Sequence, residues 1–198
     1  MEISKEIVKD IIQSRESTFV NGLLEGGKID DSVIESILEN AIWAPSHGLG
    51  QVWDFKVFAG QGVVSFFNKM QEIYKYTTAS DKYRQEKYEG YPSKANKVSH
   101  IIAIIARRDP RKKFPKLEDI VSTSCAIQNI YLSLGVHGVA GYLSTGDICY
   151  TQATREYLQL GDEDECLGFF QLGIKDTSKS GRQRKRIPAK EKTVWVRE

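Results

Sequence analysis

The sequence of 198 residues has few of the residue types that build metal sites or disulfide frameworks. It contains three cysteines and three histidines. The cysteines form no Cys-x-x-Cys pair and the histidines lie far apart, which argues against a zinc site or a disulfide framework. We therefore expect no metal site and three reduced thiols, as is typical of a cytoplasmic protein.

Long apolar runs and a strong net charge are also missing. The longest apolar run, from Ile101 to Ala106, is far too short to span a bilayer. Charged residues stand at positions 2, 5 and 6, where a signal peptide needs an apolar core. The net charge of +2 gives no field that would imply nucleic acid or a membrane as a partner. These features indicate a soluble cytoplasmic protein.

Hydrophobic periodicity predicts a chain that mixes helices and strands. Spacing of three and four residues indicates helices, and alternation or a β-branched apolar run indicates strands. The predicted helices cover residues 3–12, 33–42, 63–74, 117–134 and 151–160; the predicted strands cover 53–57, 98–106, 136–144 and 166–174. The tyrosine-rich segment 75–97 is expected to form a mobile helix or an excursion over the core. Residues 1–198 show no boundary that would divide them, so we expect one domain that ends in a basic arm, 177–198.

The predicted helix Leu117–Leu134 carries apolar residues around much of its circumference. Such a helix is buried nearly all round, either inside a core or in a dimer interface.

Four segments could carry chemistry. In Arg15-Glu16-Ser17 a forked cation stands beside a short hydroxyl, which suits a phosphate, although such residues after a helix are usually a solvated cap. The loop from Ala44 to Phe55 could face the polar edge of a planar ligand, or it could be an ordinary connection. The segment Gly141–Asp147 ends a strand, and its glycines allow a close approach of the backbone.

The fourth segment is the basic run Gly181–Pro188, which could be a solvated tail, a nucleic-acid patch or an arm that docks on a phosphate. A second basic cluster follows the apolar strand, and we interpret it as a solvated loop, with attraction of the extra phosphate of NADPH as the alternative. Its members are Arg107, Arg108, Arg111, Lys112 and Lys113.

The order of these motifs, together with Leu167-Gly-Phe-x-x-Leu-Gly173, resembles the nitroreductase family, and the match to its small single-domain branch extends over nearly the whole chain. The resemblance implies an α+β fold with a central mixed or antiparallel sheet flanked by helices. It also implies a homodimer formed through the long helix, with FMN at the interface.

The resemblance assigns cofactor-binding roles to the matching positions. Arg15 and Ser17 match the phosphate and ribityl contacts, and Pro45, Ser46 and His47 match a loop that reaches the flavin of the partner subunit. The whole set implied is Arg15, Glu16, Ser17, Pro45, Ser46, His47, Gln51, Leu143, Ser144, Thr145, Arg184 and Arg186.

Three positions depart from the family pattern. Glu16 replaces the middle arginine of Arg-Arg-Ser and subtracts positive charge, and Leu49 and Val52 replace an asparagine and a proline of the loop.

The implied activity is reduction of a nitroaromatic, quinone or similar planar acceptor. NAD(P)H would first reduce FMN in a ping-pong cycle, so no catalytic side chain is required. Gly135, Gly138 and Gly141 do not form a dinucleotide-binding fingerprint, which a transiently bound nicotinamide does not need. The alternatives are other flavin chemistry, a flavin- or nucleotide-binding protein without turnover, and, least favoured, a nucleic-acid-binding protein.

Overall fold

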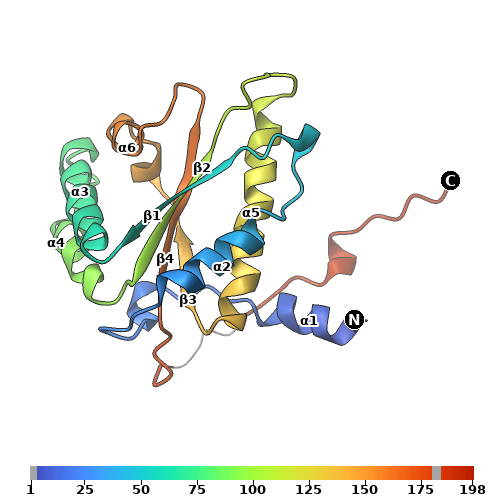
Figure 1. Cartoon of the computed structure of the whole chain (residues 1–198), viewed down its shortest axis with the longest axis horizontal. Helices are drawn as coiled ribbons and strands as arrows, with labels where there is room; N and C mark the ends of the chain where they lie inside the picture. The colour runs from blue at the N-terminus through green and yellow to red at the C-terminus, as the bar shows by residue number, and fades with distance from the viewer. Residues whose placement is uncertain (1–3, 180–183) are drawn as a thin grey trace.

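The computed structural model describes residues 4–179 and 184–198 (Figure 1). Residues 181–183 of the predicted basic run therefore lie outside the described residues.

Four antiparallel strands form the sheet in the order β1-β2-β4-β3. They are β1 (Trp53–Ala59), β2 (His100–Ala106), β3 (Ala140–Ser144) and β4 (Glu165–Gly173). All seven residues of β2 are buried, as the β-branched apolar run predicts for a central strand. The expected α+β fold with an antiparallel sheet is confirmed.

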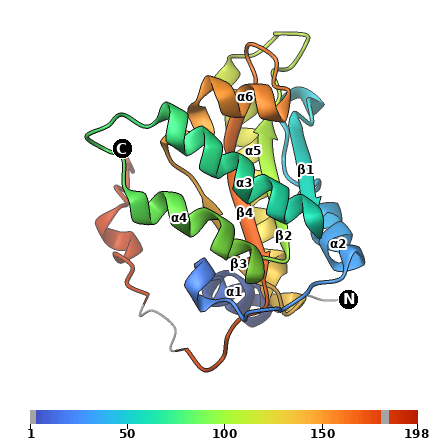
Figure 2. The ribbon, with the colours of Figure 1, turned by 90° about the vertical axis from the view of Figure 1, so that its left-hand side faces the viewer.

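Helices cover both faces of the sheet (Figures 1 and 2). α2 (Asp31–Ala41) and α5 (Lys116–Val136) pack on one face, where Ile37, Ile130 and Phe170 share a core cluster. α3 (Gln61–Thr77) and α4 (Gln85–Ser93) pack on the other face. The remaining helices are α1 (Lys5–Ser14), α6 (Gln152–Leu158) and the short 3-10 helices η1 (Val20–Gly22), η2 (His47–Leu49), η3 (Lys94–Asn96), η4 (Asp147–Tyr150) and η5 (Ala189–Glu191).

One predicted segment differs from the structure. The strand predicted from residue 136 is wrong in its first part, because α5 continues to Val136 and β3 starts only at Ala140.

Segment 75–97 contains helix α4, whose Tyr91 is buried. Tyr83, which precedes this helix, stacks on Tyr74 with 5.4 Å between the ring centroids. Aromatic packing therefore anchors this polar segment on the core.

The long helix α5 is not buried all round within one chain. Its inner face holds Ala126 and Ile130 in the core, but Leu117 is 64% exposed and Val121 is 49% exposed. Helix α1 likewise buries none of its residues, although Ser4 caps its first turn by accepting a hydrogen bond from the Ile7 N–H. Both helices thus present apolar side chains that this chain leaves uncovered.

Among the described residues, no helix has both the length and the apolar composition to cross a membrane.

Candidate functional site at the edge strand

The first and third sequence motifs meet at the edge strand β3. Thr18 donates a backbone hydrogen bond to the Gly141 carbonyl at 2.9 Å, which aligns the segment after α1 with the strand. A side chain at Gly141 could not be accommodated, because its Cβ would lie 2.3 Å from the Gln171 carbonyl oxygen. This close approach is the reason for a glycine here.

Tyr131 of α5 joins the two motifs. Its hydroxyl accepts a hydrogen bond from the Leu143 N–H at 2.9 Å and another from the Ser17 hydroxyl at 3.3 Å. The Arg15 guanidinium lies over the Tyr131 ring at 4.9 Å and donates to the Ser17 hydroxyl at 3.4 Å. The structure therefore brings Arg15, Ser17 and Leu143 together, and gives the first two a fixed support.

The charge of Glu16 is balanced within the chain. Its carboxylate forms an ion pair with Lys175, the residue two positions beyond β4. No ion pair with a carboxylate is found for Arg15 among the described residues, so its guanidinium keeps donors for an anionic ligand. Arg184 donates to the carbonyl oxygens of Gln13 and Arg15 at 2.6 and 2.9 Å, which brings the C-terminal arm to the same place.

A cavity of about 340 Å³ adjoins the end of β3, on the face covered by α3 and α4. Ser144 and Thr145, both in the set that the resemblance assigns to the cofactor, line it together with Lys94 and Gln171. Burial and the nearby charge of Lys87 lower the pKa of Lys94. The amide oxygen of Gln171 is buried and has no hydrogen-bond partner among the described residues. The cavity thus combines apolar walls with a cation and an unused acceptor, as ligand sites do.

The loop of the second motif lies elsewhere in the same chain. The His47 N–H donates to the Ser122 hydroxyl at 3.3 Å, near the N-terminal end of α5, whereas Tyr131 lies nine residues further along (Figure 1). At 1.5 Å per residue this separation is about 14 Å along the helix. Within the loop, the Ser46 hydroxyl accepts from the Gln51 N–H at 2.6 Å. We call Tyr131, Arg15, Ser17 and Leu143 the Tyr131 cluster. One chain does not bring the loop residues Pro45, Ser46, His47 and Gln51 to this cluster.

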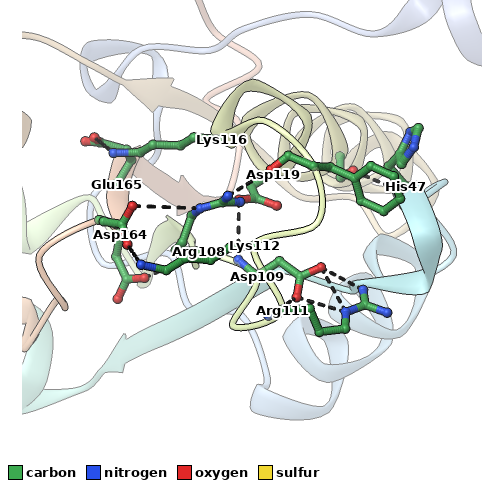
Figure 3. Close-up of polar contacts among 12 residues, drawn as sticks. His47, Arg108, Asp109, Arg111, Lys112, Lys116, Asp119, Asp164 and Glu165 are labelled. Atoms are coloured by element: carbon green, nitrogen blue, oxygen red, sulfur yellow. Dashed lines mark hydrogen bonds and ion pairs between the residues drawn. The ribbon is translucent and has the colours of Figure 1, made fainter.

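The basic cluster after β2 forms an ion-pair network within the chain, although Arg111, Lys112 and Lys113 are exposed, as expected of a solvated loop (Figure 3). Arg108 pairs with Asp119 at 2.6 Å, and both side chains are largely buried. Arg111 pairs with Asp109 at 2.7 Å. Arg107 pairs with Asp54 and Asp164, and Lys112 pairs with Glu163. Four of the five cations thus pair with carboxylates of the same chain, which weakens the support for an NADPH phosphate contact here.

The last predicted residue, Arg186, is exposed, and its guanidinium donates to the carbonyl of the neighbouring Lys185. Among the described residues it makes no contact with the Tyr131 cluster.

Sequence reasoning missed Tyr131, Lys94 and Gln171. A polar amide inside an apolar strand was a signal for Gln171, whereas nothing distinguished Tyr131 from the other hydroxyl-bearing residues of its helix. Lys94 gave none, because a lysine in a polar segment is ordinary.

An antiparallel sheet between two helical layers, with a cation–hydroxyl cluster and a ligand-sized cavity at its edge strand, defines a ligand-binding α+β protein. Comparison with known proteins gives the family. The model of the nitroreductase family matches residues 24–174, and the chain belongs to this family. The predicted family and an oxidoreductase activity are thereby confirmed.

One relative and two solved structures show the extent of the likeness. YdjA from Escherichia coli (strain K12), whose name assigns it provisionally as an NAD(P)H nitroreductase, is 26% identical over 140 residues, which are 71% of this chain and 74% of that protein. The nitroreductase-like family protein from Bacillus cereus has a TM-score of 0.80 at 19% identity, with 99% of each chain covered. The FMN-dependent nitroreductase NfnB from Mycobacterium smegmatis, solved with NADPH, has a TM-score of 0.73 at 14% identity, with 96% of this chain and 98% of that chain covered.

Proposed function

We propose that this protein is an FMN-dependent oxidoreductase that uses NAD(P)H to reduce nitroaromatics, quinones or similar planar acceptors in a ping-pong cycle. The observation that carries the proposal is the convergence of Arg15, Ser17 and Leu143 on Tyr131, next to the strand whose last residue, Ser144, lines the cavity at the end of β3. NfnB, which shares the fold, is named as FMN-dependent and was solved with NADPH.

The residues at this edge fit FMN chemically. Arg15 and Ser17 offer charge-assisted and hydroxyl donors to a phosphate. Ser144 and Thr145 line a cavity whose buried amide oxygen at Gln171 needs a hydrogen-bond donor from a ligand. Lys94 supplies a partly desolvated cation in the same cavity, which favours negative charge on a bound ring.

When bound, FMN supplies the hydride chemistry, and the chain supplies binding and orientation. Tyr131 fixes the backbone N–H of Leu143 and the hydroxyl of Ser17. Arg15 is held by its contact with Ser17, and Arg184 by its contacts with backbone carbonyls. These side chains therefore lose little further conformational entropy when the phosphate binds.

We also propose that the working form is a homodimer whose sites each take the Pro45–Gln51 loop from the other chain. The uncovered side chains of Leu117 and Val121 on α5 support this, since exposed apolar patches mark interaction surfaces. Three free thiols agree with the cytoplasm as its compartment.

The test uses the full chain, which is purified without added flavin and then titrated with FMN. We expect tight FMN binding and, under anaerobic conditions, loss of the visible flavin absorbance on addition of NADH or NADPH. A protein that does not bind FMN would overturn the proposal. A protein that binds FMN but is reduced by neither nucleotide would instead be a flavin-binding protein without this turnover.

A further inference from the structure

Gln171 carries a buried hydrogen-bond acceptor that nothing described in the chain uses. The residue lies in β4 and is 4% exposed. Its side chain lines the cavity of about 340 Å³, and its Oε1 atom has no partner among the described residues. An unpaired buried acceptor is costly, so a sequence that places an amide here gains only if a donor reaches the oxygen.

Gln171 lies opposite Tyr142 in the pairing of β4 with β3, so the two side chains share one face of the sheet. Burial raises the pKa of Tyr142, and the side chains of Ser144 and Gln171 oppose this rise. Among the buried side-chain nitrogen and oxygen atoms of the described residues, Oε1 of Gln171 is the one without a hydrogen-bond partner. This oxygen is therefore the acceptor on the cavity wall that is available to a ligand.

Lys94 adds a complementary donor to the same cavity. Its ammonium group lies over the Tyr91 ring at 4.7 Å and has no carboxylate partner among the described residues. The polar part of the wall therefore offers one neutral acceptor and one cationic donor. A ligand that satisfies both offers an N–H donor to Oε1 and an acceptor to the ammonium group, and a cyclic imide carries both kinds of group.

We propose that Gln171 recognises the imide edge of the FMN ring by accepting a hydrogen bond from the ring N3–H. This inference rests on the proposed function, because FMN is the imide-bearing ligand that the proposal places at this edge. Gln171 is accordingly a binding residue that selects flavins with a free N3–H, and it takes no part in hydride transfer.

The experiment compares FMN with FMN methylated at N3 by fluorescence titration of the full chain. We expect the methylated flavin to bind the wild-type protein about tenfold more weakly, the effect of losing one buried hydrogen bond. This comparison needs no variant and no turnover.

The variant Gln171→Met keeps the length of the side chain and removes the acceptor. We expect it to bind FMN about tenfold more weakly and to bind both flavins nearly equally. Thermal unfolding without flavin should be unchanged or shifted upward, because no buried polar atom is left unpaired. Gln152→Leu, on the exposed face of α6, is the matched control and should retain the discrimination.

Each other outcome decides against the inference. Equal binding of the two flavins by the wild type means that a water or another protein group satisfies Oε1, or that the amide is turned the other way. Discrimination that persists in Gln171→Met means that N-methylation acts by steric bulk alone. In both cases FMN still binds and the proposed function stands. No binding of FMN at all would overturn the proposed function and this inference together.

Discussion

The Tyr131 hydroxyl accepts the backbone N–H of Leu143 at 2.9 Å and so ties the long helix α5 to the edge strand β3. The same oxygen accepts from Ser17, which belongs to the segment after α1. Three parts of the chain that are remote in sequence are thereby fixed relative to one another. The Tyr131 oxygen thereby sets the positions of two residues proposed to hold FMN, Ser17 and Leu143.

Replacing Tyr131 with phenylalanine tests this relationship. The variant keeps the ring beneath Arg15 and leaves the Leu143 N–H without its partner, so we expect the free energy of unfolding to fall by about 1 kcal/mol. FMN affinity should fall as well, since Ser17 loses its support. Urea unfolding and FMN titration measure the two effects. Tyr76→Phe, at a side chain that is 81% exposed, is the control, and equal behaviour of the two variants would show that the hydroxyl has no such role.

Arg15→Ala should weaken FMN binding on the order of 1.5–3 kcal/mol, the scale of a hydrogen bond to a charged group. The effect should be smaller for riboflavin, which lacks the phosphate. The exposed Arg84→Ala, which breaks a surface ion pair with Glu86, is the matched control and should leave the affinity unchanged. If Arg15→Ala binds FMN as tightly as the wild type, Arg15 does not hold the phosphate.

A charged residue on the exposed face of α5, which carries Leu117 and Val121, should separate the two chains of the proposed dimer. We expect Val121→Glu to scatter light as a species near 22.4 kDa, while the wild type has twice that mass. FMN affinity should fall in parallel, because the monomer loses the loop from the other chain. Val64→Glu, at an exposed position of α3, serves as the control. A wild-type protein that is monomeric at micromolar concentration would contradict the shared site.

The ion pair of Asp109 with Arg111 should make stability depend on acid. Hydrogen bonds from Arg111 lower the pKa of Asp109 from 3.8 to about 2. Because the folded pKa lies below the unfolded value, the stabilising contribution is complete above the unfolded pKa and is lost as the pH falls through the folded one. Urea unfolding should therefore show Asp109→Asn less stable than the wild type near neutral pH. The difference in free energy of unfolding between the two proteins should disappear as the pH falls from about 5 to about 2.

Asp81→Asn, at an exposed carboxylate without an ion pair among the described residues, should show no such closing gap. A difference between wild type and Asp109→Asn that stays constant with pH would rule out this ion pair as its source.

Local sequence patterns predicted the sheet and most of the helices. The β-branched run predicted a buried strand, and every residue of β2 is buried. The alternation predicted strand β1, but not its burial throughout: Trp53 is buried, whereas Val57 is 41% exposed. The Arg-x-Ser motif was recognisable because its residues are adjacent. The start of the strand predicted from residue 136 was wrong because α5 runs through Gly135, a residue that normally favours a helix end.

The parts that could not be predicted depend on contacts between remote segments. Nothing near Arg108 in the sequence indicates that Asp119 and Asp164 would neutralise the basic cluster. Likewise, Gln171 shares a cavity with Lys94, 77 residues away along the chain, only because α4 and η3 pack over β4. Pairing of this kind is decided by tertiary packing and leaves no mark in a short window.

The most direct test of the central claim separates the two halves of the proposed cycle. The FMN-loaded protein is reduced anaerobically with NADPH or NADH, freed of nucleotide by gel filtration, and mixed with a quinone. The account predicts that the flavin absorbance returns in full, with one quinone reduced per bound FMN and no nucleotide present. Flavin that stays colourless until nucleotide is added again, or that was never bleached by either nucleotide, would contradict it.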